Sequence, residues 1–318
     1  TLSEAIVLGL LRQNVRIFLG VFGHGTTEVG EVLRIYAEAG IVRVFGVRHE
    51  TEAAHAATAL RWVTGEKCAV FTSIGPGALN ALTGALPQLS DGLGVWYLLG
   101  DETTEDEGPN MQQIAKPGQG HFLRPFESLG AAYSLHTPGA VTTALRYGGN
   151  TVDHPYRPGP FFLLLPMNTQ PILMREFNLY ELPEAAPPKP GICLAPDIRA
   201  AAKAIHAAKS VVVKVGGGAR NAGPELLEFL ELADAVAVTS PLVSGVIPFA
   251  HPRNMTVGGS KGSISGNFAM EEADLAVVLG TRAVCQSDCS RTGYLKAKQI
   301  VSINADLDAA THHNSTLA

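Results

Sequence analysis

The chain has 318 residues and a formal net charge of −5 at neutral pH. Hydrophobic residues make up 46% of it and charged residues 17%, which is typical of a folded protein and excludes a disordered one. The absence of a basic block argues against a nucleic-acid partner. No apolar run approaches the roughly 18 residues of a membrane-spanning helix. The length predicts two domains.

The first half of the chain alternates between helix and strand signals. Helices are expected over residues 2–11, 29–37, 50–62 and after 77, and strands over residues 15–22, 42–47, 68–73, 95–99 and 161–165. Because the strands are continuously apolar and separated by helices, they predict a parallel sheet covered on both faces.

Five prolines in residues 183–196 predict a semi-rigid linker. Residues 1–182 would then form the first domain and residues 197–318 a second one. Strands are expected there over residues 211–215, 235–238, 275–279 and 299–303, with a helix over 224–232. The predicted fold class is therefore α/β, with two doubly wound parallel-sheet domains, the second of them Rossmann-like.

The cysteines and the first residues favour a cytoplasmic protein. Only Cys285 and Cys289 are close in sequence, and neither a second pair nor a nearby histidine completes a zinc-site pattern. Reduced thiols are the simpler interpretation. Residues 1–4 lack the basic segment of a signal peptide.

Ligands of open parallel sheets bind beyond the carboxyl ends of the strands. Loops 23–28, 48–50, 73–80 and 100–120 follow predicted strands, so we expect them to converge. Glu50 begins a predicted helix, where the positive helix end favours a carboxylate.

Neither local pattern is decisive alone. An ordinary N-terminal helix charge would also explain Glu50. Gly75-Pro76-Gly77 gives a turn with exposed backbone, suited to close approach by a ligand. Taken alone, the motif is better explained by an ordinary strand-to-helix turn.

Several motifs in register resemble thiamine-diphosphate enzymes. RHE at 48–50, TSIGPGALNALTGAL at 72–86 and LLGD at 98–101 resemble their pyrimidine-binding domain. FGHGT at 22–26, SIGPGALN at 73–80 and NMQQ at 110–113 look most like the trihydroxycyclohexane-dione hydrolases, with the acetolactate synthases as close relatives. IPFAHPRN at 247–254, EEADLAVVLGTR at 271–282 and VSINADLDAATHHN at 301–314 follow the order of the middle domain.

The resemblance implies a role for each matching residue. The family's glutamate at the Glu50 position is catalytic, since it hydrogen-bonds the cofactor's aminopyrimidine and promotes its imino tautomer. A carboxyl group shielded from water favours its neutral form, which suits such proton sharing. Pro76, Asn80 and Gly25 would help to bind the cofactor, although Asn80 is also compatible with a plain helix surface.

The substrate side would include the first loop and a glutamine. His24 matches a position that faces the reacting end of cofactor and substrate, where an imidazole can move protons near neutral pH. A histidine that only packs is the alternative. Gln112 matches a substrate-side glutamine of the synthases. The register is defined only to within one residue, so the adjacent Gln113 is the alternative.

The resemblance also implies thiamine diphosphate with Mg²⁺, and a third domain that holds the diphosphate. Its GDG motif is not found, so we assign no metal ligand to this chain. We expect the third domain on a second subunit, in a dimer of such pairs (a heterotetramer); a fragment of a longer chain is the alternative. The middle domain of the synthases can hold FAD, but the glycine turn at 216–220 is a weak signal, and we favour a nucleotide site retained only as a fold.

The leading hypothesis is an enzyme that breaks or forms a carbon–carbon bond next to the carbonyl of a small molecule. Cleavage of a 1,2-diketone and acetolactate-type ligation of 2-keto acids both remain open. A non-catalytic regulatory or scaffold subunit is the alternative from another class. A nicotinamide dehydrogenase would rest only on the turn at 216–220, which lacks the G-x-G-x-x-G spacing.

Overall fold

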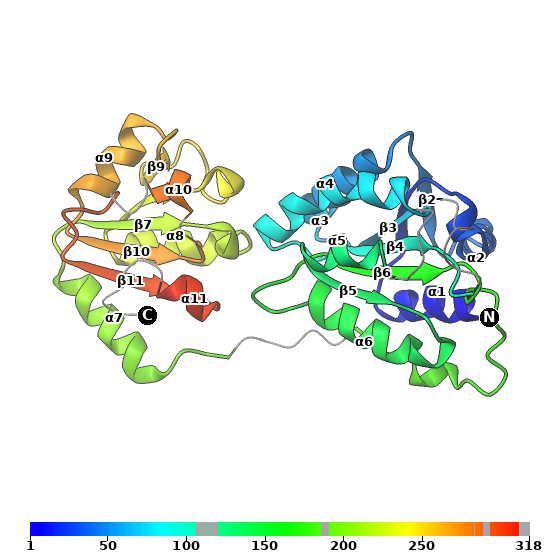
Figure 1. Ribbon diagram of the computed structural model, residues 1–318. Helices are drawn as coiled ribbons and strands as arrows, with labels where there is room; N and C mark the ends of the chain where they lie inside the picture. The colour runs from blue at the N-terminus through cyan, green and yellow to red at the C-terminus, as the bar shows by residue number, and fades with distance from the viewer. Residues whose placement is uncertain (106–112, 114–119, 186–190, 283, 289–292, 312–318) are drawn as a thin grey trace. The chain divides into compact units, whose positions relative to one another are not determined.

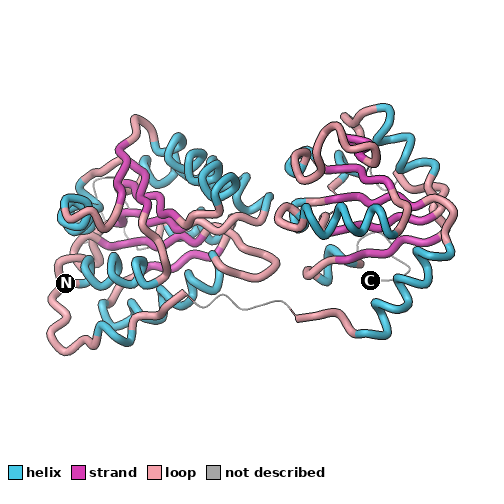
Figure 2. Tube along the Cα trace, turned by 180° about the vertical axis from the view of Figure 1, so that it is seen from behind, coloured by secondary structure: helices cyan, strands magenta, loops and turns pink. Residues whose placement is uncertain are grey.

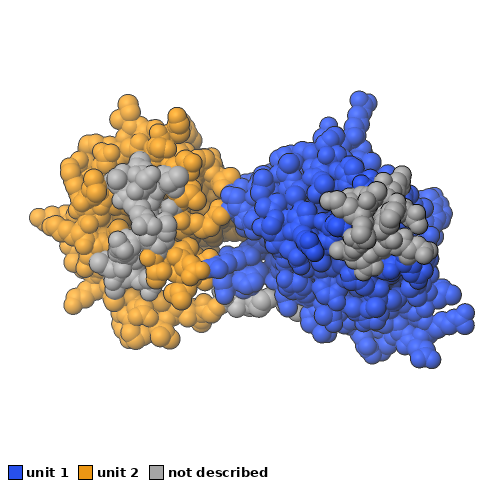
Figure 3. All heavy atoms as spheres, in the orientation of Figure 1, with its two compact units in different colours: residues 1–189 blue, residues 190–318 orange. Residues whose placement is uncertain are grey.

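The computed structural model describes residues 1–105, 113, 120–185, 191–282, 284–288 and 293–311. The chain divides into two compact units, Thr1–Lys189 and Pro190–Ala318 (Figure 3). Figure 2 shows the strands of each unit gathered side by side. They form one sheet in each unit, and all neighbouring strands are paired in parallel. The predicted class, two α/β units with parallel sheets, is therefore confirmed.

The described residues of unit 1 form six strands in the order β2-β1-β3-β4-β6-β5 (Figure 1). Its elements are α1 (Leu2–Arg12), β1 (Ile17–Gly20), η1 (His24–Thr26), α2 (Thr27–Glu38), β2 (Arg43–Gly46), α3 (Glu50–Thr64), β3 (Cys68–Thr72), α4 (Pro76–Asp91), β4 (Trp96–Asp101), α5 (Leu123–Glu127), β5 (Ala131–Ser134), η2 (Pro138–Ala140), α6 (Val141–Val152), β6 (Phe161–Pro166) and η3 (Leu179–Glu181).

Helices bury both faces of this sheet. Side chains of α1, α2 and α6 pack with Phe18, Phe71 and Trp96 on one face. Small alanines of α3 and α4, together with Phe126 of α5, pack with Tyr97 and other strand residues on the opposite face. Because successive strand residues point to opposite faces, strands buried on both sides must be apolar throughout. This is why the apolar runs of the sequence predict β1, β3, β4 and β6.

Within the part of unit 2 that the structure describes, five strands lie in the order β11-β10-β7-β8-β9. Its elements are α7 (Ala195–Ala207), β7 (Val211–Val215), η4 (Gly217–Ala219), α8 (Gly223–Leu232), β8 (Val236–Thr239), η5 (Pro241–Val243), β9 (Asn254–Val257), α9 (Ile264–Glu272), β10 (Leu275–Leu279), α10 (Cys285–Asp288), β11 (Gln299–Ile303) and α11 (Leu307–Ala310). In Figure 1, α9 lies beside β9 at the top of this unit, and α7 lies below β11.

Local sequence explains where the helices of unit 1 begin and end. Thr1 and Glu4 form a capping box at the start of α1. Gly65 ends α3 and Gly92 ends α4, each in the left-handed conformation with φ of +73° and +66°. The two helices lie side by side. Each follows a strand of the parallel sheet, so their first turns lie at the carboxyl edge of the sheet.

Two strands have no counterpart among the predicted ones. β5 and β9 lie at the edges of their sheets, and their residues are only partly buried. An edge strand with one face near solvent does not need a continuous apolar run, so the signal that marks the inner strands is weak there. No helix among the residues that the structure describes is long and apolar enough to cross a membrane.

Candidate active site

Glu50 lies at the start of α3, directly beyond the carboxyl end of β2. Residues 47–49 are the whole connection between the two elements. His49 caps the helix, because its Nδ1 accepts a hydrogen bond from the amide of Thr51 at 3.2 Å. The cap fixes the backbone of Glu50, and the partial positive charge of the helix start favours its half-buried carboxylate.

Asn80 of α4 contacts Glu50 directly. Its Nδ2 donates a hydrogen bond to Oε2 of Glu50 at 3.1 Å. The hydroxyl of Thr51 donates in turn to the backbone carbonyl of Asn80 at 2.8 Å. The two bonds join the first turn of α3 to the first turns of α4, and they fix the direction of the Glu50 carboxylate.

Gly77 faces the other oxygen of that carboxylate. A Cβ atom at position 77 would lie 2.9 Å from Oε1 of Glu50, which is closer than a carbon atom ordinarily approaches. Within the described part of the chain, Oε1 of Glu50 accepts no hydrogen bond. The missing side chain thus leaves room beside an oxygen that is still able to accept a proton or a hydrogen bond.

The Gly-Pro-Gly turn aims the start of α4 at this position. Gly75 has φ of +59° and ψ of −107°, a conformation that residues with a side chain rarely adopt. Pro76 occupies the first helical position, where its missing N–H leaves no bond unmade and its fixed φ suits the helix. Pro76 is exposed, whereas the two glycines that flank it are buried.

The first loop contacts two neighbouring loops through close backbone packing. A Cβ atom at Gly23 would lie 2.3 Å from Oγ of Ser73, and one at Gly100 would lie 2.8 Å from the carbonyl oxygen of Gly25. The loop after β1 therefore touches the loop after β3 and the carboxyl end of β4, as the parallel sheet predicts. His24 is exposed, and its imidazole makes no hydrogen bond with the residues that the structure describes.

Gln113 also reaches the Gly-Pro-Gly turn. Its backbone N–H donates to Oε1 of Glu102 at 3.2 Å, and its Cγ lies 3.2 Å from where a Cβ atom at Gly75 would be. Glu102 is only 8% exposed. The hydrogen bond therefore attaches the backbone of Gln113 to a buried carboxylate. Gln112 lies outside the described residues.

The structure thus joins some of the predicted site residues and leaves others apart. Glu50 and Asn80 are in direct contact, with Gly77 against them, and Gln113 lies against the turn that precedes Pro76. No hydrogen bond joins His24 or Gly25 to Glu50 among the described residues.

Gln170 is a residue of this region that the sequence reasoning missed. It is 1% exposed and follows β6. Its Nε2 donates to the carbonyl oxygens of Gly25 at 2.7 Å and of Leu165 at 2.9 Å. It therefore holds the first loop to the end of β6. Ligands of parallel sheets bind beyond the carboxyl ends of the strands, and this holds for β6 as well as for the other strands. A polar side chain shortly after the apolar run of β6 is the sequence feature that could have indicated Gln170.

The glycine turn of unit 2 has a different environment. The amide of Gly216 donates to the Leu279 carbonyl at 2.9 Å, and the amide of Gly218 to the Gly280 carbonyl at 2.8 Å. A Cβ atom at Gly216 would lie 2.4 Å from Cα of Thr281. These glycines let the turn pack closely against the loop that follows β10.

Cysteines and other possible metal ligands are scattered. No group of three or more His, Cys, Asp or Glu side chains suited to a metal ion occurs in the described part of the chain. Cys68 is a buried free thiol and Cys193 an exposed one. The side chain of Cys285 and the whole of Cys289 lie outside the described part.

Comparison with known protein families gives two matches that follow one another along the chain. Residues 1–119 match the model of the thiamine pyrophosphate enzyme N-terminal TPP binding domain. Residues 198–316 match the model of the thiamine pyrophosphate enzyme central domain. The chain belongs to the thiamine pyrophosphate enzyme family. The resemblance that the motifs indicate is thereby confirmed.

Curated relatives of this thiamine pyrophosphate enzyme chain include hydrolases and synthases. A 3D-(3,5/4)-trihydroxycyclohexane-1,2-dione hydrolase of Listeria monocytogenes is 26% identical over 96% of this chain and 50% of its own length. The acetolactate synthase isozyme 3 large subunit of Escherichia coli is 28% identical over 96% of this chain and 52% of its own length. A probable acetolactate synthase large subunit of Methanocaldococcus jannaschii is 27% identical over 97% and 51%. The chain spans about half the length of these relatives.

The site residues fit the pyrimidine end of a thiamine diphosphate. A polar heterocycle needs a hydrogen-bonding group on one edge and space for its ring. Glu50 supplies an oxygen with no bond to the described residues, and Gly77 leaves the space beside it. The glycines at 23, 25 and 100 bring backbone rather than bulky side chains to the neighbouring loops.

Proposed function

We propose that this chain supplies the pyrimidine-binding half of a thiamine-diphosphate-dependent enzyme acting on a carbon–carbon bond next to a carbonyl. Family membership supports the cofactor class, and relatives named as dione hydrolases and acetolactate synthases support the reaction class. The single observation that carries the proposal is the placement of Glu50 against Asn80 and Gly77.

Glu50 is the catalytic carboxylate in this proposal. Oε1, which accepts no hydrogen bond from the described residues, lies against a ring nitrogen of the aminopyrimidine, and one proton is shared between the two atoms in a hydrogen bond. Holding the carboxyl group in this position allows it to share a proton with that nitrogen. The bound cofactor supplies a carbanion-type nucleophile for the substrate carbonyl and an electron sink for the bond that breaks or forms.

The residues around Glu50 position the cofactor and the substrate. Asn80 holds the Glu50 carboxylate, while Pro76 and the backbone of Gly25 line the pyrimidine pocket. The exposed His24 moves protons at the substrate side, as an imidazole is able to do near neutral pH. Gln113 and its neighbour Gln112 contact the substrate. Cleavage of a 1,2-diketone and ligation of 2-keto acids both suit this arrangement.

The partner in this proposal is a polypeptide that carries the diphosphate-binding domain with its Mg²⁺. The curated relatives are about twice as long as the matched region, which supports a further domain in the working enzyme. Two such pairs would form a heterotetramer. Flavin is not needed by the proposed reaction, because the chemistry belongs to the thiamine cofactor.

An exposed apolar face on α3 and α4 fits such a partner. Leu79, Leu86 and Leu89 are 40%, 48% and 46% exposed, and their spacing places them on one face of α4. Val63 of α3 is 78% exposed. We infer that the diphosphate-binding domain covers this face, because α4 also begins at the proposed site and a contact there would bring the two halves of the cofactor pocket together.

Replacement of Glu50 by Gln tests the catalytic assignment. In the assembled enzyme, Glu50→Gln should lower turnover by about 100-fold or more, since removal of a positioned acid–base group has an effect on the order of 10² to 10⁴. Glu52→Gln is the matched control, because Glu52 lies in the same helical turn and is exposed. Equal turnover of the wild type and Glu50→Gln would refute the assignment and favour a non-catalytic subunit.

Charge placed on the apolar face tests the partner contact. The double variant Leu86→Arg, Leu89→Arg should lower the mass of the native assembly, because a buried interface does not tolerate unpaired charges. Leu232→Arg, at an 80% exposed position of α8, is the control and should leave the mass unchanged. An assembly that survives the double variant would contradict the inferred face while leaving the Glu50 assignment intact.

A further inference from the structure

A cavity of about 560 Å³ lies at the edge of the first sheet opposite to Glu50. Its lining comes from the first residues of β1 and β2, Ile17 and Arg43, and from the segments that precede β1, β2 and β3. Because the strands are parallel, their amino ends meet here, whereas their carboxyl ends lead to the loops of the proposed active site. The cavity is therefore separate from that site.

Positive charge predominates on the cavity wall. Arg16, Arg43 and Lys67 line it, against the single carboxylate of Glu66. The whole chain carries a formal net charge of −5, so a cavity with more cations than anions departs from the average surface. Such a local excess of one sign concentrates ligands of the opposite charge.

Arg16 and Arg43 differ in their partners. Arg16 is exposed, and its side chain makes no hydrogen bond or ion pair with the residues that the structure describes. Arg43 pairs with Glu66 at 3.0 Å, and both of these side chains are more than half exposed. An exposed ion pair is weak, so a ligand carboxylate can compete with Glu66 for Arg43.

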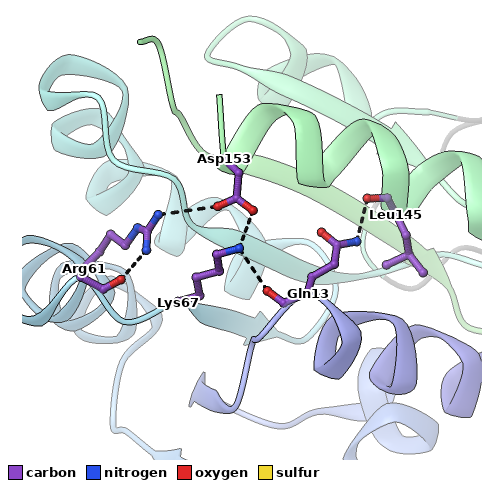
Figure 4. A network of polar contacts seen from close by, with 6 residues as sticks. Gln13, Arg61, Lys67, Leu145 and Asp153 are labelled. Carbon is purple, nitrogen blue, oxygen red and sulfur yellow. Dashed lines mark hydrogen bonds and ion pairs between the residues drawn. The ribbon is translucent and has the colours of Figure 1, made fainter. Parts of the chain in front are cut away.

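Lys67 lines the cavity and belongs to a polar network, which Figure 4 shows. The ammonium group of Lys67 pairs with Asp153 and donates to the backbone carbonyl of Gln13 at 3.1 Å. Arg61 reaches the other oxygen of Asp153 at 3.7 Å. Gln13 donates through Nε2 to the Leu145 carbonyl at 3.0 Å. The network links α1, α3 and the residue before β3 to the end of α6, and so holds Lys67 in place.

The rest of the lining favours an apolar body on the ligand. Ile17 and Val42 are almost fully buried in the wall, and Ile41 is 41% exposed beside them. Gly40 and Gly65 have φ of +70° and +73° and present no side chain, and nothing lies within 4 Å of where their Cβ atoms would be. The space next to the arginines is therefore open and partly apolar.

We propose that this cavity binds a small organic monocarboxylate with a short apolar chain. Arg16 and Arg43 supply planar guanidinium groups that match a carboxylate in two parallel hydrogen bonds. Glu66 on the same wall repels a phosphate dianion more strongly than a carboxylate monoanion. Ile41 and its neighbours take up the apolar chain.

Titration calorimetry of the full chain at about 0.15 M salt tests the proposal, with isovalerate, acetate and inorganic phosphate as probes. Isovalerate should bind at one site and more tightly than acetate or phosphate. Arg16→Gln should weaken isovalerate binding about tenfold, because one charge-assisted contact is lost. Glu66→Gln should strengthen it severalfold, because Arg43 loses its competing partner.

Arg34→Gln is the matched control, since Arg34 is an exposed arginine of α2 paired with Glu31 and Glu38. It should leave the affinity unchanged. The absence of saturable heat with isovalerate would overturn the proposal, as would equal affinities of the wild type, Arg16→Gln and Glu66→Gln. Tighter binding of phosphate than of isovalerate would overturn the choice of a monocarboxylate. Each variant changes an exposed side chain, so unfolding measurements should show an intact fold.

Discussion

Two glycine-rich turns connect a strand to a helical turn, one in each unit, and the structure gives them different tasks. In unit 1, Gly77 leaves space beside the side chain of Glu50. In unit 2, Gly216 and Gly218 let the backbone of the turn lie against the backbone of the Gly280 loop. A glycine next to a flexible carboxylate leaves space for a ligand. A glycine between two backbone segments allows only those segments to pack closely.

This contrast predicts different consequences when a methyl group is added. In unit 1 the group that must move is the end of a Glu side chain. In unit 2 the neighbours are backbone atoms, which cannot move without disturbing β10 and the loop after it. We therefore expect loss of function from the first change and loss of stability from the second.

The largest effect on stability should come from Gly216→Ala. Its Cβ would lie 2.4 Å from Cα of Thr281 and 2.5 Å from the carbonyl oxygen of Gly280. Overpacking of this kind costs about 1–3 kcal/mol of unfolding free energy. Urea denaturation followed by circular dichroism measures it, and an unchanged midpoint would show that the turn has room for a side chain.

Gly245→Ala is the control for this measurement in the same unit. Nothing lies within 4 Å of where its Cβ would be, and its φ is ordinary. The variant should unfold like the wild type or be more stable by up to about 1 kcal/mol, since alanine restricts the unfolded chain.

Gly77→Ala should have a smaller effect on folding and a clear effect on cofactor binding. The added Cβ would press on Oε1 of Glu50, whose side chain is able to turn away. The unfolding free energy should change by less than about 1 kcal/mol. The half-saturating concentration of thiamine diphosphate in the assembled enzyme should rise about tenfold, the equivalent of about 1.4 kcal/mol. If the variant loses stability but still binds the cofactor normally, the expectation that Gly77 serves the ligand rather than the fold is contradicted.

The third and smallest effect concerns Cys68 and Cys193, the two cysteines whose free thiols the structure describes. Burial raises the pKa of Cys68 in unit 1 to about 12, whereas a thiol in an unfolded chain ionises near 9. Unfolding therefore releases a proton between pH 9 and 12, and the unfolding free energy falls as the pH rises through that window. Between pH 8.5 and 10 the loss should be about 1 kcal/mol.

Comparison with Cys68→Ala isolates this contribution. The variant lacks the thiol, so its unfolding free energy should fall less steeply between pH 8.5 and 10. Parallel pH profiles of the two proteins would contradict a thiol that stays protonated in the folded state. The exposed Cys193 of unit 2 should react with a thiol reagent in the native protein at pH 8, while Cys68 should not.

The inner strands of both sheets could be predicted because burial on two faces demands apolar residues. β7 shows the limit of that rule. Its apolar run contains Lys214, which is 1% exposed and whose Nζ donates to the carbonyl oxygens of Thr239 and Gly258. Thr239 is the last residue of β8 and Gly258 follows β9, and a single sequence does not show which carbonyl groups will meet a buried lysine.

Only part of the site could be predicted, because some of its contacts join residues that are far apart in the sequence. The approach of the loop after β1 to the loop after β3 and to the carboxyl end of β4 follows from a parallel sheet, and the family resemblance selects Glu50 and Asn80. The hydrogen bond between those two residues depends on how α3 and α4 pack, as does the fit of Gly77 against Glu50. The bond from Gln170 to Gly25 joins residues from the two ends of unit 1. Such pairings arise only in the folded chain.

The most direct test of the central claim is the composition of the purified native assembly. Its intact mass, the identity of its polypeptides and the amount of bound thiamine diphosphate should be measured together. The account predicts one thiamine diphosphate for each copy of this chain, in an assembly that also contains the diphosphate-binding domain. A native assembly that contains that domain but neither retains nor takes up thiamine diphosphate would contradict it.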